Sequence, residues 1–260
     1  MPVRLTILGS GSNGNCACLE TDQTRVLIDA GFSLRQIRQR LSTIGRDLES
    51  LDGVLVTHEH TDHIQGLGLL AQKFGVPVYC NRLTRDALEY QLKRPLSYRV
   101  FETGASFNVG DICVETFPVP HDAQDPVAFL ARAGTVTVGF VTDLGHATRL
   151  VIERSRAANV LLLESNHDVK LLQECPHRPW SLKQRILSRH GHLSNEAAAD
   201  AVQEIIGPQL RHLYLGHLSS QCNRPELARD VVQRRLDSLG AAHVALNVAS
   251  QDAPCRTLSL

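Results

Sequence analysis

The segment THEHTDH, residues 57–63, places three histidines and one aspartate within six positions. It directly follows residues 53–56, a short apolar run that predicts a buried strand. Imidazole and carboxylate groups are ligands for Zn, Mn and Fe, and a loop at the end of a strand can turn successive side chains toward one point. The chain has 12 histidines among 260 residues, so a polar loop with chance histidines is the weaker interpretation. The segment therefore predicts a metal site.

This segment alone supplies too few ligands for two metals. His58 and His60 are two positions apart and could face one metal from the same side. Asp62 and His63 are displaced along the turn and could serve a second metal, although a site with one metal and four ligands stays open. Any further ligands must come from the ends of other strands.

Three candidates of this kind stand where apolar runs end. His121 follows residues 114–119, Asp143 follows residues 136–142, and His217 follows residues 213–215. We expect these side chains to complete the site.

The composition favours a soluble globular protein. It is 43% hydrophobic, and its 27 Lys and Arg balance 27 Asp and Glu, so binding of nucleic acid would require a local basic patch. No run of eighteen apolar residues occurs, and no membrane association is expected. The 7 cysteines are odd in number and contain no CxxC spacing, which favours a reducing compartment, and we expect a cytoplasmic location.

Strand and helix signals alternate along most of the chain. Ser33 is expected to cap a helix, residues 64–74 have helical periodicity, and residues 98–142 read as a meandering sheet without a helix. Neither a low-complexity linker nor a change in composition divides the chain. We therefore expect one layered α/β domain over residues 1–260.

The motif HxHxDH, followed in order by His, Asp and His at strand ends, resembles the metallo-β-lactamase superfamily. The resemblance implies an α/β fold of the αββα kind, with two mixed β-sheets flanked by helices. It assigns one metal to His58, His60 and His121. It assigns the other to Asp62, His63 and His217, with Asp143 bridging the two. The implied cofactors are two divalent ions, with Zn preferred by the histidine-rich set and Mn or Fe accepting the same ligands.

Further strings resemble one branch of that superfamily, the YycJ/WalJ-like exonucleases and phosphodiesterases. They are GSGSNGN at 9–15, ESNHD at 164–168, GHLSN at 191–195, HLS at 217–219 and NRPELA at 223–228. The resemblance implies hydrolysis of a phosphodiester by a hydroxide that bridges the metals. It also implies DNA rather than RNA as substrate, and attack from the 5′ end. Cys222 departs from the pattern, which has a second asparagine there, and this puts one substrate contact in doubt.

Two side chains are expected to act in the reaction. Asp62 would be both a ligand and a hydrogen-bond partner of the nucleophile. His192 would clamp the phosphate or protonate the departing oxygen, although a lone histidine before a helix could also be a surface residue. Substrate-binding or supporting roles are expected for Ser12, Asn13, Glu164, His167, Ser194, Asn195 and Ser219. The glycine loop could present backbone N–H groups to a phosphate or be an ordinary turn.

A basic stretch precedes GHLSN. Between Glu174 and Glu196 there is no acidic residue. The cations of this stretch are Arg178, Lys183, Arg185 and Arg189. They could form an ordinary basic helix face, or a surface that follows phosphates with Trp180 available for base stacking.

Other functions share the same metal chemistry. Small-molecule hydrolysis is the main alternative, either of cyclic phosphodiesters or of thioesters and lactones in the manner of glyoxalase II. A metal-binding scaffold without catalysis is a third possibility. The sequence indicates no particular protein partner.

Overall fold

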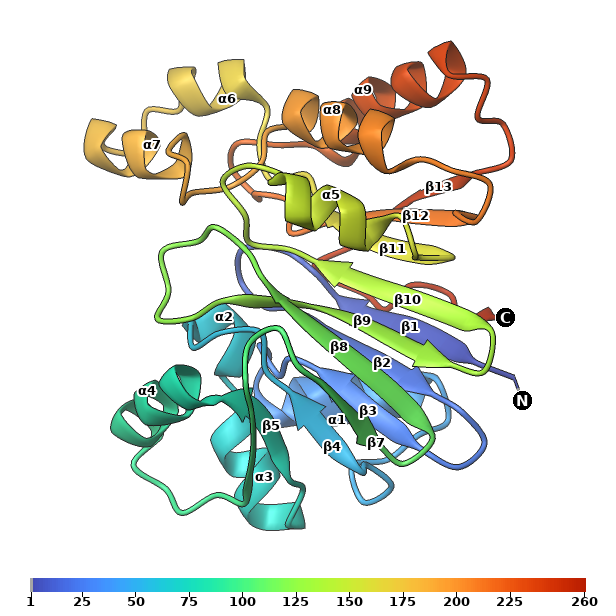
Figure 1. Ribbon diagram of the computed structural model, residues 1–260. Coiled ribbons are helices and arrows are strands. Elements are labelled where there is room, and N and C mark those ends of the chain that lie inside the picture. The colour runs from blue at the N-terminus through green and yellow to red at the C-terminus, as the bar shows by residue number, and fades with distance from the viewer. Residues whose placement is uncertain (1) are drawn as a thin grey trace.

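Two mixed β-sheets pack face to face in the computed structural model, which describes residues 2–260 (Figure 1). The first sheet has the order β14 (Leu258–Ser259), β1 (Arg4–Gly9), β2 (Cys16–Glu20), β3 (Arg25–Ile28), β4 (Gly53–Leu55), β5 (Val78–Asn81) and β6 (Tyr98–Phe101). The second has the order β13 (Ala245–Val248), β12 (His212–Gly216), β11 (Val160–Glu164), β10 (Val136–Val141), β9 (Val127–Ala133), β8 (Ile112–Pro118) and β7 (Ser106–Val109).

Helices cover the outer faces of both sheets, so the predicted αββα sandwich is confirmed (Figure 1). The first sheet carries α1 (Leu34–Thr43), α3 (Leu67–Phe74) and α4 (Arg82–Leu92), with the short α2 (Thr61–Ile64) at one end. The second sheet carries α5 (Arg149–Ser155), α8 (Asn195–Ile205) and α9 (Pro225–Ser238). The remaining helices, α6 (Val169–Glu174) and α7 (Trp180–Ile186), project at upper left in Figure 1. No helix within residues 2–260 has the length and apolar character needed to cross a bilayer.

The apolar strands are buried on both faces. In β11, Val160 and Leu162 belong to the core between the sheets, whereas Leu161 and Leu163 pack with the helices outside. A strand in this position needs apolar residues at successive positions, because neither face meets water. This explains why residues 159–163 lack the alternation of a half-exposed strand.

Two local expectations need correction. The helix expected over residues 64–74 begins only at Leu67, as α3, whereas Ile64 ends the short α2; between them the Gly66 N–H donates to the Ala30 carbonyl instead of to a helical partner. The meander expected over residues 98–142 begins only at β7, since β6 pairs in parallel with β5 of the first sheet. The Ser33 cap is confirmed, with a reciprocal capping box to Gln36.

Several strands of the second sheet end at the same edge. The strands β10, β11 and β12 are mutually parallel, and β9 runs antiparallel to both β8 and β10. The carboxyl ends of β8, β10, β11 and β12 therefore share one edge, where ligands bind in open α/β sheets.

A buried carboxylate joins the first strands. Glu20 on β2 is 4% exposed and lies 3.0 Å from Arg4, 2.6 Å from Arg25 and 2.8 Å from Arg46. Burial raises the pKa of this carboxyl, but the three guanidinium groups outweigh burial and lower the pKa to about 2.

The Glu20→Gln variant should lose roughly 2–3 kcal/mol of unfolding free energy at pH 7. Because the pKa is depressed in the folded state, this stabilisation is present above the ordinary carboxyl pKa and disappears as pH falls through about 2. Urea unfolding of both proteins between pH 7 and about 2 measures the difference in unfolding free energy. The Glu49→Gln variant, which changes an exposed carboxylate, is the control. A difference independent of pH would contradict the assignment to charge.

Candidate metal centre

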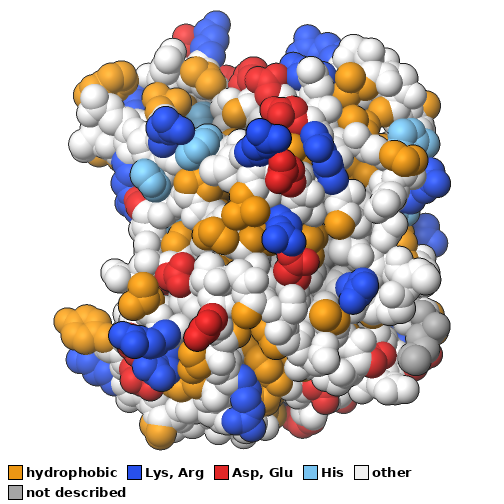
Figure 2. Space-filling model, in the orientation of Figure 1, with side chains coloured by type: hydrophobic (Ala, Val, Ile, Leu, Met, Phe, Trp, Pro, Cys, Tyr) orange, Lys and Arg blue, Asp and Glu red, His pale blue; other side chains and the backbone are white. Residues whose placement is uncertain are grey.

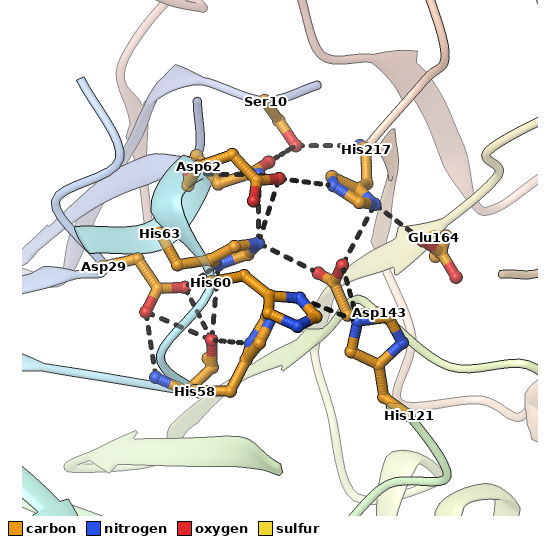
Figure 3. Close-up of polar contacts among 12 residues, drawn as sticks. Ser10, Asp29, His58, His60, Asp62, His63, His121, Asp143, Glu164 and His217 are labelled. Atoms are coloured by element: carbon orange, nitrogen blue, oxygen red, sulfur yellow. Dashed lines mark hydrogen bonds and ion pairs between the residues drawn. The ribbon is translucent and has the colours of Figure 1, made fainter. Parts of the chain in front are cut away.

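The seven predicted ligands lie together at the shared edge of the strands (Figure 3). The loop after β4 and the helix α2 carry His58, His60, Asp62 and His63. The loops after β8, β10 and β12 carry His121, Asp143 and His217. Strand direction thus brings together side chains that are far apart in sequence.

One group of possible ligands consists of His58, His60 and His121, whose ligand atoms lie within 4.8 Å of one another. His121 Nε2 is 3.2 Å from His60 Nδ1. Within residues 2–260, buried His58 Nε2 has no hydrogen-bond partner. Burial lowers the pKa of His58 well below its ordinary value, so the ring is neutral, as a ligand must be. An unpartnered, neutral imidazole nitrogen in this position fits a cation.

The second group consists of Asp62, His63 and His217, with the same spacing of ligand atoms. Asp62 Oδ2 is 3.2 Å from His217 Nε2 and 3.6 Å from His63 Nε2. Burial lowers the pKa of His217, but Asp143, Asp62 and Glu164 outweigh burial and raise it to about 10. A cation in this group would therefore displace a proton.

Asp143 lies between the two groups. Its Oδ2 is 3.2 Å from His63 Nε2, and its Oδ1 is 3.7 Å from His121 Nε2. The pKa of this buried carboxyl is well below its ordinary value, since nearby His217 and His63 outweigh the opposing effect of burial. An ionised carboxylate with one oxygen toward each group suits a bridging position.

Acceptors behind the rings fix which nitrogen faces the centre. His63 Nδ1 lies 2.8 Å from Asp29 Oδ2, and His121 Nδ1 lies 3.1 Å from the Gly191 carbonyl oxygen. His58 Nδ1 lies 3.0 Å from the Thr57 hydroxyl, which itself donates to Asp29. Donation from Nδ1 leaves Nε2 as the ligand atom in these three rings.

Glu164 supports the centre from behind. Its wholly buried carboxylate lies 2.7 Å from His217 Nδ1 and 2.8 Å from His192 Nδ1. It also accepts from the backbone N–H groups of Leu144 and Leu193. Burial raises the pKa of this carboxyl, but the two histidines outweigh burial and lower it to about 2. Glu164 therefore stays ionised and orients both rings.

Three residues around the centre have a left-handed backbone. The φ angles are +59° at Asp29, +59° at Asp143 and +56° at His217. Such values are uncommon outside glycine and concentrate at functional sites.

A cavity of about 510 Å³ opens above the centre. His60, Asp62, His121, Asp143 and His217 form one part of its lining. Further lining residues are Ser12, Asn13, Asn166, Arg178, Arg185 and His192. Figure 2 shows the molecular outline indented on the left, between the parts that Figure 1 labels α7 and α4.

The glycine loop does not present the backbone cradle that its sequence suggested. The N–H of Gly11 donates to Asn15 Oδ1, the N–H of Asn13 to Gln251 Oε1, and the N–H of Gly14 to the Gly11 carbonyl. These groups hold the loop together. The backbone N–H of Ser12 and the side chains of Ser12 and Asn13 remain as candidate contacts in the cavity.

The other expected supporting residues lie behind the cavity. Ser194 caps α8 through the Ala197 N–H, and Asn195 joins Ser165 and Asn223 in a buried hydrogen-bond network. Ser219 is 3% exposed and accepts from the Cys222 N–H. Both ring nitrogens of buried His167 lack hydrogen-bond partners among residues 2–260, and burial lowers its pKa to about 4. These positions suit structural support rather than direct contact with a substrate.

Cys222 does not belong to the cavity lining. This side chain is wholly buried and packs with Leu172, Cys175 and Ile186 beneath α6 and α7. The position faces an apolar cluster, so the absence of asparagine there removes no contact from the cavity.

Sequence reasoning missed the role of Asp29. It follows β3 and begins the string DAG at residues 29–31, which by itself is typical of a turn. An acidic residue at the end of an apolar strand was the available signal, the same one that identified Asp143.

Residues 24–217 match the family described as "Beta-lactamase superfamily domain". The chain is 38% identical over 242 residues to exodeoxyribonuclease YycJ of Bacillus anthracis, covering 92% of this chain and 91% of that protein. It is 40% identical over 237 residues to exodeoxyribonuclease WalJ of Streptococcus pneumoniae serotype 2, covering 90% and 88%. The metallo-β-lactamase fold protein YhfI of Bacillus subtilis has the same fold, with a TM-score of 0.74 and 17% identity over 100% of this chain and 99% of that one.

The Glu164→Gln variant should bind Zn²⁺ about 10- to 100-fold more weakly than the unchanged protein. The amide loses the charge that holds His217 and His192, and its NH₂ group opposes their donors. Competition with a chromophoric chelator measures the affinity. Glu153→Gln, which removes an exposed carboxylate on α5, is the control. Unchanged affinity in Glu164→Gln would show that this carboxylate does not support the centre.

Proposed function

Because the chain belongs to the β-lactamase superfamily and to its YycJ/WalJ group of exodeoxyribonucleases, we propose that this hydrolase cuts phosphodiester bonds of DNA. One observation carries the proposal beyond family membership: five of the seven candidate metal ligands and two guanidinium groups line the same cavity. The ligands suit cations that bind a phosphate, and the guanidinium groups suit a polyanion. We propose on the same ground that residues 1–260 act as one domain, since both sheets supply ligands to one centre.

The proposed cofactors are two divalent ions. His58, His60 and His121 would hold one ion, and Asp62, His63 and His217 the other. Asp143 would bind both. Zn is the preferred ion for these imidazole-rich groups, although Mn and Fe accept the same ligands. When bound, such ions supply Lewis acidity toward the phosphoryl oxygens and lower the pKa of coordinated water to about 7.

Two residues of the cavity are proposed to act on the substrate. Asp62 lies at the cavity surface and would accept a hydrogen bond from the attacking nucleophile, fixing its orientation. His192 also lines the cavity, and its Nδ1 is held by Glu164 at 2.8 Å. Its Nε2 is therefore the nitrogen that would deliver a proton to the departing oxygen.

Digestion of labelled DNA tests the proposal. Metal-loaded protein should degrade DNA from the 5′ end, the direction that the YycJ/WalJ resemblance implies, and should hydrolyse bis-p-nitrophenyl phosphate. Strands labelled at the 5′ or the 3′ end, single or double, separate the directions, and matched RNA strands test the choice of polymer. Rapid cleavage of a glutathione thioester with inert phosphodiesters would instead establish a thioesterase.

The His192→Ala variant should reduce kcat on DNA by about 10²- to 10⁴-fold, because the departing oxygen loses its proton donor. Metal content should stay unchanged, since His192 is not one of the seven proposed ligands. Steady-state kinetics and metal analysis check both expectations. The exposed His190→Ala serves as the matched control in the same segment. Full activity in His192→Ala would exclude the role.

A further inference from the structure

The segment of residues 178–192, here called the strap, crosses the cavity from one group of ligands to the other. At one end Arg178 contacts Ser219 and Gln221, in the loop that follows His217. Near the other end Arg185 pairs with Asp122, which follows His121. The Gly191 carbonyl accepts from His121 Nδ1, so the strap also supports a ligand. The basic stretch singled out in the sequence therefore forms part of the cavity lining.

Two of its four cations do not face the cavity. Lys183 is 8% exposed, and its Nζ donates to the Gln173 carbonyl at 2.6 Å, which ties α7 to α6. Arg189 is exposed and lies 3.4 Å from His146, away from the cavity lining. The contacts of Lys183 and Arg189 account for these two cations of the basic stretch without any role in binding a substrate.

The two cations that line the cavity differ in their partners. Arg185 forms an ion pair with Asp122, so a carboxylate already compensates its charge. Arg178 hydrogen-bonds Gln221 Oε1 at 3.2 Å and Ser219 Oγ at 3.3 Å, and it forms no ion pair within residues 2–260. A guanidinium has five N–H donors, and these contacts use two of them. Arg178 therefore holds an uncompensated charge and free donors at the cavity wall.

The contacts of Arg178 also fix its place. Ser219 is 3% exposed, and its oxygen accepts from the Cys222 N–H at 3.1 Å, which anchors one partner. A planar guanidinium held in this way matches the oxygens of a phosphate, which it binds through charge-assisted hydrogen bonds. Five of the candidate metal ligands line the same cavity, where the bond to be cut would lie.

We propose that Arg178 binds the phosphate next to the scissile one, and that it selects for substrates with a second phosphate. This inference rests on the proposed nuclease function. Arg185, by contrast, holds Asp122 and the strap in place. The phosphate could be a terminal one or the next phosphodiester of the strand, and both present the same oxygens.

The test compares Arg178→Gln with the unchanged enzyme on two substrates. On DNA, the variant should raise KM about 10- to 100-fold and reduce the salt dependence of binding by about one counterion. On bis-p-nitrophenyl phosphate, which has one phosphate, it should act like the unchanged enzyme. Arg189→Gln, a cation of the same strap away from the cavity, should change neither reaction.

Chemically altered DNA strands distinguish whether Arg178 binds a terminal phosphate or the next phosphodiester. An effect of Arg178→Gln that disappears with 5′-hydroxyl strands identifies a terminal phosphate. An effect that persists there and disappears with a neutral methylphosphonate beside the scissile bond identifies the next phosphodiester.

Several results would overturn the inference while the nuclease proposal survives. One is an Arg178→Gln enzyme with unchanged KM on DNA. Another is an equal loss of activity of Arg178→Gln on DNA and on bis-p-nitrophenyl phosphate. A third is a reduced metal content of the variant. Either result would indicate that Arg178 has a structural role near His217. Failure of the unchanged enzyme on both phosphodiesters would instead refute the proposed function itself.

Discussion

The carboxylate of Glu164 joins more of this site than any metal ligand does. It stands at the end of β11 and accepts from four donors: the rings of His192 and His217 and the backbone N–H groups of Leu144 and Leu193. These donors come from three separate loops. An ionised carboxylate without exposure to water is costly unless each oxygen is paired, and here each oxygen accepts twice. The hydrogen bonds to Glu164 therefore fix the positions of these loops and of the candidate ligands that the loops carry.

Strained backbone accompanies this arrangement. Asp143 follows β10 and His217 follows β12, and both adopt left-handed φ values that side chains with a Cβ seldom adopt. Asp29 does the same after β3, where it orients His63. Each turn directs a side chain toward the centre immediately after its strand. The buried sheets and the hydrogen bonds behind the rings offset the strain.

The candidate ligands and a layered α/β domain could be predicted from the residues themselves because both depend on local identity, whereas the αββα arrangement was implied by the family resemblance. Histidine and aspartate at the ends of apolar runs indicate candidate metal ligands. Apolar runs without alternation indicate strands that are buried on both faces. The fourfold role of Glu164 could not be predicted, since its donors meet only after the sheet is assembled. The same reason explains the glycine loop, where Asn15 and the distant Gln251 occupy two of the N–H groups that the motif seemed to offer. Likewise, four cations in one stretch look alike until the fold buries Lys183 and pairs Arg185 with Asp122.

The charges of the cavity also impose an order on binding. Its lining contains the carboxylates of Asp62, Asp122 and Asp143, and only Asp122 has an arginine partner there. Without cations, the other two carboxylates are balanced by protons on neighbouring imidazoles, since the pKa of His63 is raised well above its ordinary value and that of His217 to about 10. Divalent ions replace those protons and bring more positive charge than they displace. Under the proposed function, a polyanion would therefore bind after the metals, and a chain with no net charge would hold it through cations concentrated in the cavity.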